Sequence, residues 1–162
     1  MYKAIENYYI QDETITSIGQ FAVLWGMVEE KFFDKCCTSP KLARMIVLNV
    51  SEEMILLADS IKKSLLAHYN SVENREMEEF LCLRGKDKSF SEKVRPFLGE
   101  NEIDSDSKIF SAVCVCFRIR NNLFHGEKIF WLLNDQKGIL DSCAAFMDAL
   151  LSNKAALQIQ DK

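Results

Sequence analysis

Apolar residues in this chain recur every three or four positions, and this spacing is the feature that most restricts its fold. The clearest case runs from Asp12 to Cys37. Its apolar residues would share one side of a helix: Ile18, Phe21, Ala22, Trp25, Val28, Phe32 and Phe33. Only 6 glycines and 2 prolines interrupt the chain. Since no region alternates apolar and polar residues long enough to form a sheet, the pattern predicts an all-α fold.

Breaks and capping signals divide the first half of the chain. We expect the first helix to end at the Thr-Ser-Pro sequence of residues 38–40, followed by a short apolar segment over 42–48. Ser51 has the position of an N-cap, and the acidic residues after it suit a helix N-terminus. The second long helix should therefore run to about Tyr69.

The second half has the same signals. A charged helix is expected over 73–83, and an N-cap signal at 105–107 precedes a third main helix. That helix carries one apolar stripe: Ile109, Val113, Cys116 and Phe117. The last helix should start near Asn134 or Asp135. Its apolar residues are Leu140, Ala144, Met147 and Leu151.

Length and composition indicate a soluble protein with one domain over residues 1–162. No apolar run is long enough for a membrane helix, and the N-terminal segment lacks the pattern of a secretion signal, so we expect a cytoplasmic protein without a membrane partner. The 6 cysteines have no zinc-type spacing and are expected to be reduced and buried. We therefore predict no metal and no cofactor.

Polar residues interrupt the aromatic and aliphatic segment from Phe117 to Trp131. The apolar stripe of the third helix, continued by its own period, places Arg120 on the core-facing side, where a guanidinium needs a partner or a solvated cleft. Asn121 and His125 are four residues apart and can meet Arg120 at the helix end. Glu29 borders the apolar stripe of the first helix and also needs a partner. The candidates are Arg118, Arg120 and His125.

These residue types suit the cleavage of RNA through its own 2′-hydroxyl. Imidazole transfers protons near neutral pH, arginine matches a phosphate in geometry and charge, and asparagine can orient either. The alternative is structural: a helix-end arginine paired with a core carboxylate, followed by a loop histidine. The net charge of −4 predicts that any RNA contact is a local patch.

The sequence RIRNNLFHGEK resembles the signature of the HEPN superfamily, in which an arginine and a polar residue precede a histidine by five and four positions. Arg120, Asn121 and His125 match this motif, and the residues around them are typical of bacterial members: Asn122, Leu123, Phe124 and Gly126. The stretches FAVLWGMVEEKFF and LNVSEEMILL are similar to the family's first two long helices. Residues 84–106 have no counterpart and are interpreted as a possible family-specific insert.

The resemblance implies a bundle of four or more helices that forms a homodimer across the motif helices. Active members are metal-independent ribonucleases, often toxins or defence effectors with a cognate antitoxin, and two motifs form one composite site. Other members only bind or scaffold. The alternative function is therefore a catalytically silent module for dimerisation, partner binding or nucleotide binding. Arg118 and Asn122 lie beside the motif and are assigned supporting roles.

Two further groups of residues are candidates for contact with RNA. Basic residues could bind its backbone: Lys86, Lys88, Lys93 and Arg95. Aromatic residues could stack on its bases: Phe117, Phe124, Phe130 and Trp131. The alternatives are a solvated surface for the first group and core or dimer contacts for the second.

Overall fold

The computed structural model describes residues 2–5, 8–70, 74–81, 83, 88–99, 101–124 and 133–161, without the side chains of 2–5, 8–9 and 88–89. The structure is 71% helical, which confirms the predicted all-α fold. In chain order the elements are β1 (Tyr2–Ile5), β2 (Tyr8–Ile10), α1 (Asp12–Phe32), α2 (Ser39–Ala43), β3 (Met45–Val47), α3 (Glu52–Tyr69), α4 (Arg75–Phe80), α5 (Lys88–Leu98), α6 (Ser105–Phe124), α7 (Lys137–Ser152) and β4 (Leu157–Ile159). Every helix in the described part of the chain is too short or too polar to cross a bilayer.

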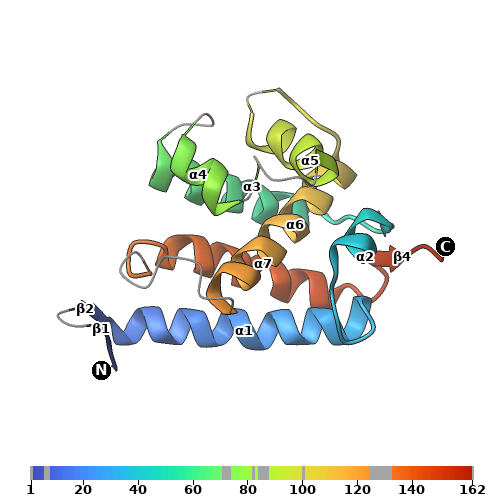
Figure 1. Cartoon of the computed structure of the whole chain (residues 1–162). Coiled ribbons are helices and arrows are strands. Elements are labelled where there is room, and N and C mark those ends of the chain that lie inside the picture. Colours follow the sequence, from blue (N-terminus) through green and yellow to red (C-terminus); the bar gives the residue numbers. More distant parts are fainter. Residues whose placement is uncertain are drawn as a thin grey trace.

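The long helices form a bundle around α6 (Figure 1). Helix α1 lies beside α7, and α7 also packs against α3. Helix α6 crosses this group and contacts α1, α3, α4 and α5. The first and last helices therefore lie side by side at one edge of the bundle, because α1 pairs with α7 rather than with its neighbour in sequence.

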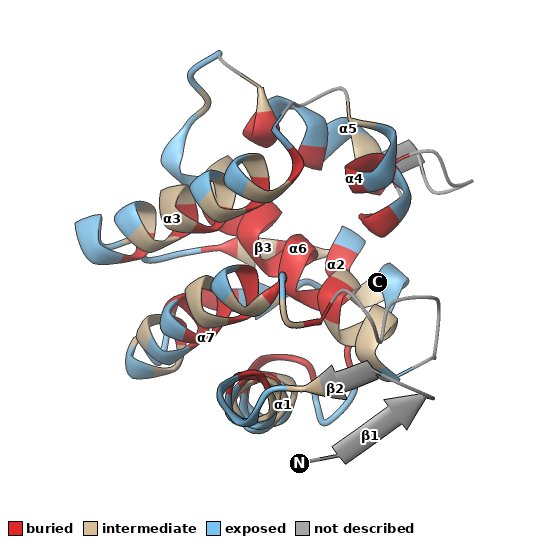
Figure 2. Ribbon diagram, turned by 90° about the vertical axis from the view of Figure 1, so that its left-hand side faces the viewer, coloured by how far each residue is buried: buried red, intermediate tan, exposed pale blue. Residues whose placement is uncertain are grey.

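Helix α6 is the centre of the core (Figure 2). The sequence predicts one apolar stripe on this helix, but every residue from 109 to 117 is buried. Ser111 is the polar residue of this run, and its hydroxyl donates to the Lys93 carbonyl at 3.0 Å. A helix that is buried on all sides has apolar residues all round, so its sequence shows no clear polar face. For this reason the predicted stripe included only some of the buried residues of α6.

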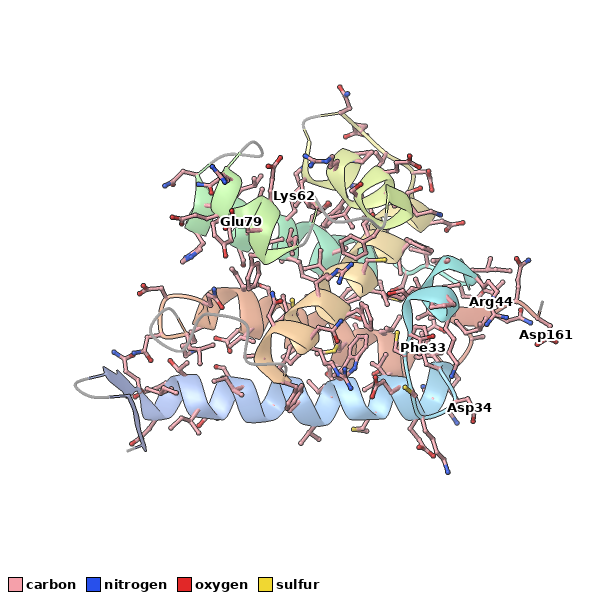
Figure 3. The ribbon with its side chains drawn as sticks, viewed as in Figure 1. Phe33, Asp34, Arg44, Lys62, Glu79 and Asp161 are labelled. Carbon is pink, nitrogen blue, oxygen red and sulfur yellow. The ribbon has the colours of Figure 1, made fainter. Side chains whose placement is uncertain are left out.

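The first helix ends earlier than predicted. It stops at Phe32 rather than at Cys37, and Asp34 and Lys35 take left-handed backbone conformations with φ of 50° and 67°. Phe33 points into the molecule and Asp34 points outward (Figure 3). The turn uses neither glycine nor proline, so no local signal marked it.

Capping residues place the next helices. Thr38 accepts a hydrogen bond from the Lys41 amide at 3.3 Å, so it starts α2 instead of only ending α1. Ser51 accepts one from the Met54 amide at 3.2 Å and starts α3, and both this N-cap and the predicted end at Tyr69 are confirmed. Helix α7 begins at Lys137, later than predicted.

Short strands occur that the sequence did not predict. Strand β3 pairs antiparallel with β4, with Met45 opposite Ile159 and Val47 opposite Leu157. Strands β1 and β2 form a second antiparallel pair. These ladders are too short to change the fold class, but β3 and β4 join the segment after α2 to the C-terminal end of the chain.

Helix α5 lies inside the stretch 84–106 that was interpreted as a possible insert. Four of its apolar residues are buried: Phe90, Val94, Phe97 and Leu98. It packs against α6, and Arg95 Nη1 donates to the buried Glu78 of α4 at 2.8 Å. Helix α5 is therefore integrated into the core, whereas residues 101–106 are mostly exposed.

Candidate functional site

Arg120 lies in the last turns of α6 and faces α1. Its Nη2 atom is 3.9 Å from Glu29 Oε1, and its Nη1 atom donates to Asn121 Oδ1 at 3.0 Å. The side chains of Arg120 and Glu29 are 27% and 12% exposed. The prediction that Glu29 lies within reach of an arginine is confirmed.

Glu29 is shared between this arginine and the backbone turn after α1. Its Oε1 atom accepts a hydrogen bond from the Cys37 amide at 3.2 Å. The Cys37 thiol is buried beside this carboxylate, and burial together with the Glu29 charge raises the pKa of the thiol. At 3.9 Å the contact between Arg120 Nη2 and Glu29 Oε1 is an ion pair that is too long for a hydrogen bond.

Phe124 is the aromatic neighbour of this arginine. The Arg120 guanidinium carbon lies 5.8 Å from the centre of the Phe124 ring, and the ring is exposed. Phe117, by contrast, is buried with its ring 6.2 Å from that of Trp25, so it is a core residue and unable to stack on a base. Phe130 and Trp131 lie outside the described residues.

Trp25 is a buried aromatic residue of α1 that lies close to Glu29 in the sequence. Its ring stacks on Phe33 at 6.4 Å, and it stands one helical turn before Glu29. Its Nε1 atom is buried and has no hydrogen-bond partner among the described residues. Such an unpaired donor is costly, and a catalytic role or an ordered water is among the explanations for one.

Arg118 takes a different direction from Arg120, as expected for residues about 200° apart around a helix. Its guanidinium carbon lies 4.5 Å from the centre of the Phe90 ring on α5, and its Nε atom is buried with no hydrogen-bond partner in the described part of the chain. The contacts that the described residues make with this guanidinium are with the rings of Phe90 and Phe117. Arg118 therefore lies apart from the Arg120 and Glu29 pair.

Asn122 joins two helices. Its Nδ2 atom donates to the Phe80 carbonyl at the end of α4, at 2.7 Å. Asn121, one residue earlier, uses its side-chain oxygen to hold Arg120. The two adjacent amides thus have separate structural tasks.

Other predicted site residues fall partly outside the description. His125 and Lys86 lie outside the described residues, and Lys88 is described by its backbone alone. Lys93 and Arg95 are exposed on α5, where Lys93 Nζ lies 4.1 Å from the centre of the Phe110 ring and Arg95 pairs with Glu78. Both keep intramolecular partners while remaining open to solvent.

A cavity of about 580 Å³ opens at the opposite end of α6. Its walls come from β3, α5 and the start of α6 and include Glu92, Glu102, Asp104 and Asp106. Arg120 and Asn121 are not among its lining residues. This cavity is therefore a feature separate from the Arg120 region, and four of its lining residues are acidic.

Most of the described thiols are buried, and buried thiols are poor nucleophiles. Cys37, Cys114, Cys116 and Cys143 are buried as predicted, and burial raises the pKa of Cys116 well above its usual value. Cys36 is the exception, because it is exposed. Among the described residues, no group of three His, Cys, Asp or Glu side chains could hold a metal ion.

Comparison with known proteins adds no relative: no family model, curated protein or solved structure matches this chain. Its chemistry has to be argued from its own residues. The described groups can bind an anion through Arg120 and hold it beside an exposed aromatic ring. Proton transfer would need His125, which follows Phe124 in the sequence.

Proposed function

We propose that this chain is a HEPN-type, metal-independent endoribonuclease in which Arg120, Asn121 and His125 carry the reaction. The position of Arg120 carries the proposal. Its guanidinium is oriented by Asn121, is partly exposed and is only loosely paired with Glu29. A purely structural arginine at a core edge is expected to have a direct, short ion pair.

The reaction uses a nucleophile from the substrate. The ribose 2′-oxygen forms a bond to phosphorus and loses its proton, while the bond from phosphorus to the 5′-oxygen breaks and that oxygen gains a proton. His125 transfers protons, and Arg120 stabilises the negative charge that builds up on the phosphoryl oxygens. The products carry a 2′,3′-cyclic phosphate and a 5′-hydroxyl.

A homodimer completes the acid–base chemistry. The attacking and leaving oxygens lie on opposite sides of the phosphorus, so one histidine serves one of them. A second His125 from a twofold partner would serve the other, and isologous dimers are the commonest assemblies. In this proposal the 117–131 segment lies near the dimer axis, and the cellular role is that of a toxin or defence effector restrained by an antitoxin.

Contacts with the rest of the RNA would be local. Phe124 is exposed beside Arg120 and would stack on a base next to the cut. Lys86, Lys88, Lys93 and Arg95 would bind phosphates farther along the strand. Such contacts would weaken as salt rises.

The decisive experiment compares wild type with His125→Ala on a defined RNA in the presence of EDTA. His68→Ala is the matched control, because the chain has 2 histidines and His68 packs against Tyr69 at the end of α3. His125→Ala should lose about 10²–10⁴-fold in rate, and His68→Ala should keep it. A substrate with 2′-deoxyribose at the cut should resist cleavage. Cleavage that requires Mg²⁺, or that cuts DNA equally well, would reject the mechanism.

The second candidate is a silent module that binds a partner without catalysis. The observation in its favour is the Arg120 and Glu29 pair itself, because Glu29 gives the arginine a structural task. This candidate predicts that the purified, partner-free dimer cleaves no RNA and that Arg120→Lys changes stability alone.

A further inference from the structure

Helix α1 has one side in the core, and its opposite, exposed side carries two apolar residues. Phe21, Trp25, Val28 and Phe32 face the core. On the other side Val23 and Met27 are 64% and 52% exposed. Figure 2 looks nearly along α1 and shows the exposed residues on the side turned away from the bundle. We call this side the outer face, and its residues are Thr16, Gly19, Gln20, Val23, Gly26, Met27 and, at one end, Glu30.

Packing within one chain does not explain the two glycines of the outer face. Gly19 and Gly26 lie inside the helix, where glycine is less stable than alanine. A Cβ atom added at either position would meet nothing within 4 Å. Neither glycine is therefore required by packing inside the chain, whereas both allow another backbone or side chain to approach α1 closely.

A groove runs along this side between α1 and α7. It encloses about 1090 Å³ and is lined by Gly19 and Val23 of α1 and by Ala144 and Ala145 of α7. Val23 is exposed beside these small residues, and the lining also includes charged side chains: Glu13, Lys137, Asp141 and Asp148. A surface that combines an apolar projection with a hollow can match a copy of itself.

We infer that the outer face binds the outer face of a second copy of this chain, with the two α1 helices antiparallel and the twofold axis beside Val23. The sequence spacing supports this register. Gly19 and Met27 stand four residues before and after Val23, so a twofold rotation places Met27 of each copy over Gly19 of the other. Gln20 and Gly26 stand three residues to either side and meet in the same way.

The charges at the ends of α1 select the antiparallel arrangement. Glu13 lies ten residues before Val23 and Lys31 eight residues after it. Both are about 80° around the helix from Val23, and in the dimer they come within about 3 Å along the axis. Each Glu13 thus meets Lys31 of the second copy, twice by symmetry. A parallel pair would instead oppose like charges and aligned helix dipoles.

Lys31 is already held at this edge of the bundle. Its ammonium donates to the Leu151 carbonyl at the end of α7 and lies 5.3 Å from the centre of the Phe32 ring. An ammonium has three protons, so a carboxylate can be bound in addition. This pre-positioning lowers the entropy lost when the pair forms.

The outer face is separate from the proposed catalytic site. Glu29, which faces Arg120, lies about 120° around α1 from Val23. Association through the outer face therefore leaves Arg120 open and does not depend on the proposed ribonuclease activity. It adds an interface to any contact made by the 117–131 segment.

The test measures assembly by light scattering and sedimentation for wild type, Val23→Glu and the control Leu56→Glu. Leu56 is 67% exposed on α3, so its substitution adds the same charge to an apolar surface elsewhere. Like charges facing each other at the axis should weaken association by about 100-fold or more, and Leu56→Glu should leave it unchanged. A monomeric wild type, or an unchanged Val23→Glu, overturns the proposal.

A fourth variant, Phe124→Glu, distinguishes this interface from the motif segment. Loss of assembly with Phe124→Glu while Val23→Glu stays assembled overturns the outer-face dimer. Loss with Val23→Glu alone, or a step to a smaller assembly with each variant, supports it. Since Val23, Leu56 and Phe124 are all exposed, these substitutions should preserve the fold, which circular dichroism checks.

Two further measurements test the register. Val23→Cys in a Cys36→Ser background should form a disulfide-linked dimer on mild oxidation, and Leu56→Cys in the same background should not. Gly19→Ala with Gly26→Ala should raise the urea midpoint of the dilute chain yet weaken association, because the methyl groups stabilise α1 and fill the hollows. No crosslink at position 23, or association unchanged by the alanines, contradicts the antiparallel register.

Discussion

The two ends of α6 differ in how completely their polar groups are paired. At the N-terminal end, Asp104 accepts hydrogen bonds from the amide and the hydroxyl of Ser107, at 2.9 and 2.7 Å. One turn later Lys108 reaches Asp59 of α3 at 3.2 Å. Short, direct contacts thus fix this end of the helix.

At the C-terminal end Asn122 makes a short hydrogen bond to the Phe80 carbonyl, but some buried polar atoms have no partner, or a distant one, among the described residues. Arg118 Nε and the nearby Trp25 Nε1 have no hydrogen-bond partner among the described residues, and Arg120 stands 3.9 Å from its carboxylate. An incompletely paired polar group destabilises a fold unless something else requires it. The N-terminal end of α6 is therefore held by short polar contacts, and the incomplete pairing at the C-terminal end is what supports the site proposed there.

The largest expected effect contrasts the two arginines of the C-terminal end. Arg120→Lys should reduce RNA cleavage by about 10²–10³-fold, because an ammonium keeps the charge but loses the forked donors. Arg118→Lys should leave the rate near that of wild type, since Arg118 stacks on Phe90. Initial rates on one RNA substrate measure both. Equal losses would show that the two arginines share one site.

An intermediate effect contrasts the two adjacent asparagines. Asn122→Ala removes the hydrogen bond to the Phe80 carbonyl and should lower the free energy of unfolding by about 1 kcal/mol. Asn121→Ala should change it by less than about 0.5 kcal/mol while releasing Arg120. Urea denaturation of both variants gives the values. A larger loss of stability from Asn121→Ala would reverse the assignment of the two amides.

The smallest expected effect is on the stability contributed by Asp104 at the N-terminal end of α6, and it depends on pH. Hydrogen bonds from Ser107 lower the pKa of Asp104. A carboxyl with a lowered folded-state pKa contributes its full stability above the unfolded value of about 4 and loses it as pH falls through the folded value. Asp104→Ala should cost about 1 kcal/mol at pH 7.

The isosteric variant sharpens this prediction. Asp104→Asn keeps an N-cap acceptor, so it should retain most of the stability at pH 7 while losing the Asp104 contribution to acid sensitivity. Urea midpoints of wild type and both variants from pH 7 to pH 3 provide the comparison. An Asp104→Asn variant with the acid sensitivity of wild type would exclude Asp104 as its source.

Sequence periodicity and capping predicted α3 well because both signals agree there. Ser51 is followed by acidic residues and by an apolar period that continues to Tyr69. The same reasoning failed at the end of α1, where the turn places Asp34 and Lys35 in left-handed conformations that glycine usually takes. Tertiary contacts, including the Cys37 amide on Glu29, hold this turn.

The candidate site was predictable in part for the same reasons. The period of the third predicted helix placed Arg120 on its core-facing side, and the apolar neighbours of Glu29 indicated its need for a partner. The divergence of Arg118 toward Phe90 was not foreseen, because Phe90 belongs to α5 and that helix was not expected. Its buried residues Phe90, Val94, Phe97 and Leu98 have helical spacing that the basic residues between them obscured.

The pairing of α1 with α7 has a consequence for synthesis on the ribosome. The Ser17 hydroxyl of α1 donates to Asp141 of α7, and Lys31 bonds to Leu151, so the first helix completes its packing against the last. At 5–20 residues per second, α7 begins to be made roughly 5–20 s after α1 is finished. During that interval the core-facing side of α1 has no α7 to cover it, which makes the nascent chain a substrate for chaperones that bind exposed apolar helices.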